Sequence, residues 1–130
     1  MRSVLLFLLP FSLLAMAACS GSKWATEGDW NHPFSIANAV VDGDSLRVTV
    51  QYGGGFRDHT FRLVADGAAT KSLPRHQRLR IEHEGQGDPG RALITLDEAF
   101  DLIPHRDPAR GRIVLLLGGW DTQLEYVYPQ

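Results

Sequence analysis

Two histidines of this chain occupy positions from which their imidazoles could act together. His59 shares the alternating phase of Phe61, two residues later, and His83 shares that of Ile81, two residues earlier. Alternate residues of a β-strand lie on one face, so both histidines are expected to point toward the core at the ends of their strands. An imidazole in such a place can hydrogen-bond a loop carbonyl or bind a transition metal.

A metal site here would need a further ligand, because such sites usually show three or more. Three carboxylates lie nearby in sequence: Asp58, Glu84 and Asp88. The candidate metal-binding set is His59, His83 and Asp88, and neutral imidazoles with a carboxylate suit zinc, copper or nickel. The simpler interpretation, which we favour from the sequence, is two partly buried histidines that hold the end of a sheet together.

The sequence predicts no catalytic residue. It contains no G-x-S-x-G elbow and no C-x-x-C pair, and the segment that begins His83-Glu84 has Gly87 where a zinc-protease helix needs its second histidine. The other three histidines lie beside prolines or in polar segments and are expected to be solvated: His32, His76 and His105.

The N-terminus has the pattern of an export signal. In residues 1–18, Arg2 precedes an apolar run that is too short for a membrane span and is typical of a signal peptide. The four residues that end at Cys19 read Met-Ala-Ala-Cys and resemble the lipobox, at which bacterial lipoproteins are cleaved and acylated on the cysteine. The alternative is an ordinary signal that leaves Cys19, the only cysteine, as a spare thiol. An odd exported cysteine needs an explanation, so lipidation of Cys19 is the prediction.

The lipid would be the contact of this protein with a membrane. Bacterial lipoproteins with Asp after the acylated cysteine tend to stay at the inner membrane, whereas Ser20 stands there in this chain. The resemblance therefore implies the outer membrane, with the domain facing the periplasm or the cell surface. Residues 19–33 contain Gly, Ser, Asp and Asn without a sustained period, and are predicted to be a tether.

Residues 34–130 are predicted to form one domain of β-strands. Apolar and polar residues alternate from Leu46 to Tyr52, and further segments with the same period follow along the chain. Turn signals rich in Gly and Asp recur about every ten residues. We therefore predict an all-β fold, an antiparallel β-sandwich of about seven strands, with the immunoglobulin-like arrangement as one candidate. A small β-barrel is the alternative.

The apolar phase of each strand predicts the core. Residues 113–117 are apolar without a break, which suits a central strand covered on both faces. The strands next to the two histidines are predicted to pair as an antiparallel hairpin, with Phe61 opposite Ile81 and His59 opposite His83. The predicted core residues are Val48, Val50, Phe61, Leu63, Leu79, Ile81, Ile94, Phe100, Val114 and Leu116.

Residues 54–61 read Gly-Gly-Phe-Arg-Asp-His-Thr-Phe, residues 83–90 read His-Glu-Gly-Gln-Gly-Asp-Pro-Gly, and residues 100–102 read Phe-Asp-Leu. Together they resemble a family of small bacterial lipoproteins of unassigned function, which carries G-G-C-x-x-H-x-F, then H-[DN]-x-x-G-D-x-C, then F-D-L. The resemblance covers about residues 36–103 and implies a disulfide in the family. Here Phe56 and Gly90 replace both cysteines, so that cross-link does not carry over. The resemblance implies no activity.

The composition is that of a folded domain without electrostatic attraction for nucleic acid. The chain is 44% hydrophobic and 22% charged, with a net charge of −2. The favoured function is a non-enzymatic binding or scaffolding module of the cell envelope, whose protein or small-molecule partner the sequence does not identify. The alternative is a periplasmic metal-binding protein that uses His59 and His83, and a small hydrolase ranks last. No cofactor is predicted apart from the transition metal of that alternative.

Overall fold

The computed structural model describes residues 28–130. The predicted signal peptide, the proposed lipidation site Cys19 and most of the predicted tether lie outside the described residues. Within residues 28–130, no helix has the length and hydropathy needed to cross a membrane.

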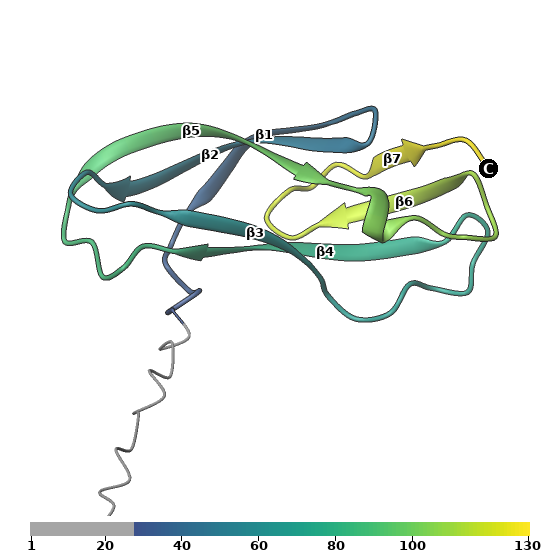
Figure 1. Ribbon diagram of the computed structural model, residues 1–130, viewed down its shortest axis with the longest axis horizontal. Helices are drawn as coiled ribbons and strands as arrows, with labels where there is room; N and C mark the ends of the chain where they lie inside the picture. The colour runs from purple at the N-terminus through teal and green to yellow at the C-terminus, as the bar shows by residue number, and fades with distance from the viewer. Residues whose placement is uncertain (1–27) are drawn as a thin grey trace, which may run out of the picture.

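Two sheets face each other and enclose the core. The three-stranded sheet has the order β1-β2-β5 and the four-stranded sheet the order β3-β4-β6-β7, which confirms the predicted all-β sandwich. Figure 1 shows β3 and β4 side by side in one layer and β2 with β5 in the other. The elements, in chain order, are β1 (Ser35–Asp42), β2 (Ser45–Gly54), β3 (Thr60–Ala65), β4 (His76–Glu84), β5 (Ala92–Asp101), a 3₁₀ turn η1 (Ile103–His105), β6 (Arg112–Leu117) and β7 (Leu124–Val127).

One pairing differs from the antiparallel pattern that the sequence predicts. β4 and β6 are parallel, from His76 opposite Val114 to Leu79 opposite Leu117, so the four-stranded sheet is mixed. The chain leaves this sheet after β4, forms β5 in the other sheet and then returns for β6. Two changes of sheet allow β6 to run in the direction of β4, whereas a tight hairpin would have reversed it.

The core lies between the two sheets and confirms most of the predicted phases. Of the residues that the sequence placed there, five are buried and three are half-buried against them. The prediction is wrong for Val114 and Leu116, which are half-buried, because Ile113 and Leu115 point into the core instead. An unbroken apolar run has no alternation to fix its phase. The buried five are Val48, Val50, Leu79, Ile81 and Phe100, and the half-buried three are Phe61, Leu63 and Ile94.

The predicted hairpin next to the histidines is present, but its register is shifted by two residues. Phe61 lies opposite His83, and Leu63 lies opposite Ile81. The predicted pairs, Phe61 with Ile81 and His59 with His83, are therefore wrong. A shift of two leaves every side chain on its predicted face, so the apolar pattern could not distinguish these registers.

The segment that precedes β1 adds a short piece of backbone pairing to β4. The N–H of His32 donates to the carbonyl oxygen of His83 at 2.9 Å, and the N–H of His83 donates to that of Trp30 at 3.3 Å. The Arg62 guanidinium lies 3.9 Å from the centroid of the Trp30 ring. Residues 30–32, which the sequence analysis assigned to the tether, are thus placed against the sheet beside the two predicted histidines.

Candidate functional site

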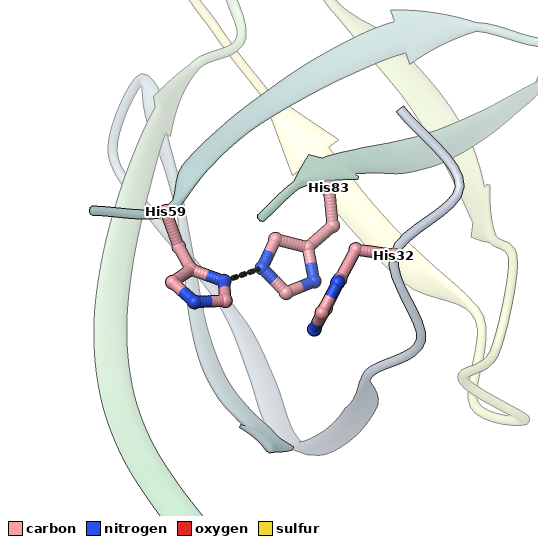
Figure 2. A group of neighbouring side chains, drawn as sticks. All are labelled: His32, His59 and His83. Atoms are coloured by element: carbon pink, nitrogen blue, oxygen red, sulfur yellow. Dashed lines mark hydrogen bonds between the residues drawn. The ribbon is translucent and has the colours of Figure 1, made fainter. Parts of the chain in front are cut away.

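Three imidazoles meet at one end of the sandwich. His32 comes from the segment before β1, His59 directly precedes β3, and His83 is the second-last residue of β4. Their ring centroids form a triangle with sides of 4.7, 4.9 and 5.0 Å. Each ring offers a nitrogen such that the three nitrogens lie within 4.8 Å of one another. Figure 2 shows the three rings gathered between these segments of the chain.

His59 is hydrogen-bonded through both of its ring nitrogens. Its Nδ1 lies 2.8 Å from Nε2 of His83, and its Nε2 lies 2.8 Å from Oδ2 of Asp88. The side chains of His59 and Asp88 are 1% and 0% exposed. An ionised carboxylate can only accept, so Nε2 of His59 carries a proton and donates to it. In the neutral imidazole the lone pair is then on Nδ1, which faces His83.

Asp88 also holds the loop between β2 and β3. Its Oδ2 accepts the backbone N–H groups of Gly55, Phe56 and Arg57 at 3.1–3.2 Å, and its Oδ1 accepts that of Gly90 at 2.8 Å. The hydrogen bond from His59, followed by these backbone donors, holds the pKa of the Asp88 carboxyl well below its usual range. Three successive N–H groups around one carboxylate form an anion-binding nest. Asp88 therefore orients His59 and the loop at the same time.

His83 is the most enclosed member of the group. Its side chain is fully buried, and burial, followed by the neighbouring His32 and His59, lowers its pKa to about 4. The ring is therefore neutral near pH 7, and its Nδ1 has no hydrogen-bond partner among the described residues. Phe61 stacks on it with a centroid distance of 4.1 Å, and Tyr52 lies 4.9 Å away. The imidazole is thus held by aromatic rings and keeps a free nitrogen.

His32 is the member that sequence reasoning missed. It was expected to be solvated, but it is half-buried, with Nε2 3.1 Å from the carbonyl oxygen of Gly53. The backbone pairing of its segment with β4 brings it to the site. A Cβ at Gly85 would lie 2.5 Å from Nδ1 of His32, so the absence of a side chain there makes room for the ring. No periodicity or motif around His32 indicates this contact.

The three carboxylates that the sequence offered as a third metal ligand differ in their positions relative to the histidines. Asp88 touches His59, and the set of mutually close donor nitrogens consists of the three histidines without it. Asp58 is exposed and Glu84 is half-buried. The structure therefore places His59 next to both His83 and Asp88, and it adds His32 to the group, while Asp88 lies outside the set of mutually close donor atoms.

The loop between β2 and β3 presents polar and aromatic groups beside the histidines. The Phe56 side chain is 79% exposed, and the Arg57 guanidinium donates to the carbonyl oxygen of Gln86. These residues, with Gly55 and Asp58, line an open hollow of about 410 Å³. The backbone of the loop is thus held by Asp88, while the Phe56 side chain is exposed to solvent.

Comparison with known proteins shows the fold. No protein-family model matches the chain, and no curated protein matches it in sequence. Among solved structures, a NigD-like immunity protein from Bacteroides caccae is similar, with a TM-score of 0.55 and 16% sequence identity. The similarity covers 74% of this chain and 55% of that protein, so this chain spans about half the length of its structural neighbour.

Proposed function

We propose that the protein is a non-enzymatic binding module of the bacterial cell envelope, held at the outer membrane by lipid on Cys19. The apolar N-terminal segment and the lipobox-like residues before Cys19 support the anchor. A non-enzymatic role is compatible with the fold likeness to a protein named as an immunity protein. A β-sandwich of this size is a scaffold on which loops at one end recognise partners.

The exposed loop between β2 and β3 is the observation that carries the binding role. It presents Phe56, 79% exposed, next to Arg57, and aromatic residues and arginine are the types enriched at the centres of protein interfaces. Three backbone hydrogen bonds to the buried Asp88 fix the loop before any partner arrives. A preorganised loop loses little conformational entropy on binding.

Cross-linking in intact cell envelopes tests this role. The wild type should capture a partner that the Phe56→Ala variant captures less well, because that change removes exposed aromatic surface without opening the core. Leu73→Ala is the matched control, since Leu73 is 70% exposed and belongs to the loop between β3 and β4. Equal capture by all three proteins would contradict a binding role for the Phe56 loop.

Metal binding in the periplasm is a second candidate function, and the geometry of two histidines favours it. Nδ1 of His59 and Nε2 of His83 face each other at 2.8 Å, and His83 keeps a second nitrogen without a partner. Metal analysis of the protein purified without a histidine tag tests this candidate. A stoichiometric divalent metal that is lost on His59→Ala would support it, and a protein that takes up none would oppose it.

A further inference from the structure

We infer that His32 completes a three-histidine transition-metal site with His59 and His83, in which Asp88 orients His59 and does not bind the ion. This inference rests on the second candidate function above and names its ligand set. The three rings come from segments that are far apart in sequence, and only the folded chain brings them together (Figure 2).

The spacing of the donor nitrogens is close to what a shared ion requires. Ligand nitrogens of a tetrahedral zinc ion stand roughly 3.3–3.4 Å apart, as follows from Zn–N bonds of about 2.0–2.1 Å. The His59 and His83 nitrogens are at 2.8 Å, and the full set spans up to 4.8 Å. An ion would therefore separate the first pair slightly and draw His32 inward. His32 and His59 are both half-buried, but His59 is held through both of its ring nitrogens. His32 has one ring hydrogen bond, to the carbonyl oxygen of Gly53, so it is the ring that would turn.

The contact between Asp88 and His59 is the arrangement that supports metal-bound histidines. A ligand imidazole usually donates its other N–H to a carboxylate, which fixes the ring and raises the basicity of the donor nitrogen. Here Nε2 of His59 donates to Asp88 and leaves Nδ1 for the ion. Asp88 is itself held by four backbone N–H groups. Its lone pairs are already engaged, so it serves as the orienting group.

The environment of His83 suits a ligand more than a structural hydrogen-bonding residue. Its ring is fully buried among aromatic rings, and one of its nitrogens has no hydrogen-bond partner among the described residues. The nitrogen without a partner is Nδ1, whereas Nε2 faces Nδ1 of His59 at 2.8 Å, so Nε2 is the atom through which His83 would bind the ion.

The donor set selects the class of ion. Three neutral imidazoles favour zinc, copper or nickel, whereas calcium and magnesium require oxygen ligands. Three protein ligands leave one tetrahedral position for water or for a group of a partner. The site lies beside the exposed Phe56 loop, because Asp88 contacts both the loop and His59.

Metal titration of the full chain tests the inference. The protein is purified without a histidine tag, stripped with EDTA and titrated with Zn²⁺ alone in a calorimeter. We expect one ion per chain, with binding weakened at least tenfold in His32→Ala. His76→Ala is the matched control, because His76 lies outside the group of three, and its affinity should equal that of the wild type.

Two further variants separate a ligand role from a structural one. Gly85→Ala keeps all three histidines but places a Cβ 2.5 Å from the His32 ring position, so it should weaken zinc binding as His32→Ala does. Asp88→Asn should weaken it about 10–100-fold, the usual effect of removing an orienting carboxylate. Imidazole ¹⁵N shifts of the zinc-bound wild type should identify Nδ1 of His59 as the ligand atom. Thermal midpoints of the metal-free variants establish that each is folded.

The results distinguish this inference from the function on which it rests. If His32→Ala and Gly85→Ala bind zinc as tightly as the wild type, His32 is not a ligand, and the two-histidine candidate stands alone. If the wild type binds no zinc, both are wrong. If His76→Ala loses binding equally, the ion sits elsewhere, and the three-histidine site is wrong.

Discussion

His83 is held neutral inside the protein by its burial and by two neighbouring imidazoles. Its pKa is lowered from an ordinary value of 6.5 to about 4. Between these two pH values the unfolded chain binds a proton that the folded chain excludes. The free energy of unfolding therefore rises with pH across this window and falls as the solution is acidified.

For the metal-free protein we predict that lowering the pH from 6.5 to 4 costs roughly 2–3 kcal/mol through His83, since one pKa unit corresponds to about 1.4 kcal/mol. Urea unfolding in the presence of EDTA measures this cost. Burial lowers the pKa of His105 as well, so the wild type is compared with His83→Gln, in which only the His83 contribution is absent. Parallel pH profiles for the two proteins would contradict the prediction.

The site could be predicted from the sequence where local phase determines it. His59 and His83 lie in the apolar phase of their strands, and Asp88 lies close enough in sequence to be a candidate. The approach of His32 depends on backbone pairing with β4 and on the space above Gly85, neither of which has a local signature. The role of Asp88 depends on hydrogen bonds to a loop that only the fold places nearby.

Strand β6 shows that an unbroken apolar run does not determine which face of a strand is buried. Residues 113–117 are all apolar, yet Leu115 is fully buried while Leu116 is half-buried. Alternation in β2 fixed Val48 and Val50 correctly, because their neighbours are polar. The hairpin of β3 and β4 was predictable, but its register and the parallel pairing of β4 with β6 were not, since both depend on long-range contacts.

The phase of β6 gives a matched pair of variants. Leu115→Ala should cost about 2–5 kcal/mol, because it removes a fully buried side chain from between the sheets. Leu116→Ala makes the same chemical change one position later and should cost clearly less. Thermal and urea unfolding measure both values. A larger loss for Leu116→Ala would mean that the strand faces the other way.

Gly90, in the loop that leads into β5, shows how closely this loop approaches the end of β2 near the histidines. A Cβ at this position would lie 2.2 Å from the carbonyl oxygen of Gly54, which is backbone and cannot turn aside. Gly90→Ala should therefore destabilise the fold by about 1–3 kcal/mol, the usual cost of overpacking. Gly53→Ala is the control, because its nearest neighbour would be 3.8 Å away. Equal unfolding midpoints for the two variants would show that the β2–β5 end is looser than described.

The closeness of residue 90 to the end of β2 also concerns the two cysteine positions of the small lipoproteins that this chain resembles. β2 and β5 pair as far as Gly54 opposite Ala92, and this register continued by two residues places Phe56 opposite Gly90. Those are the positions of the two cysteines in the family that the chain resembles. The placement is compatible with a bridge there in the family, although in this chain a side chain at residue 90 would first require the backbone to move.

The proposed lipid anchor would determine where the whole molecule resides. Cys19→Ala should abolish incorporation of radiolabelled palmitate and leave the protein soluble or unprocessed, because one or more acyl chains on this residue would be its attachment to the membrane. Ser20→Asp keeps the acylated cysteine and should move the labelled protein toward the inner membrane. A wild type that incorporates no label would contradict the anchor.

Pairing of β2 with β5 along all ten residues of β2 has a consequence for the newly made chain. The partner strand, β5, is synthesised only after β3 and β4. Until then the β1–β2 hairpin has an unpaired edge and an uncovered apolar face. Closing that long loop is entropically costly, and contacts of this kind place all-β domains among the slower folders, with times of milliseconds to seconds. Until β5 pairs with it, this hairpin is the segment of the described chain most exposed to aggregation, and a chaperone is expected to bind the folding protein there.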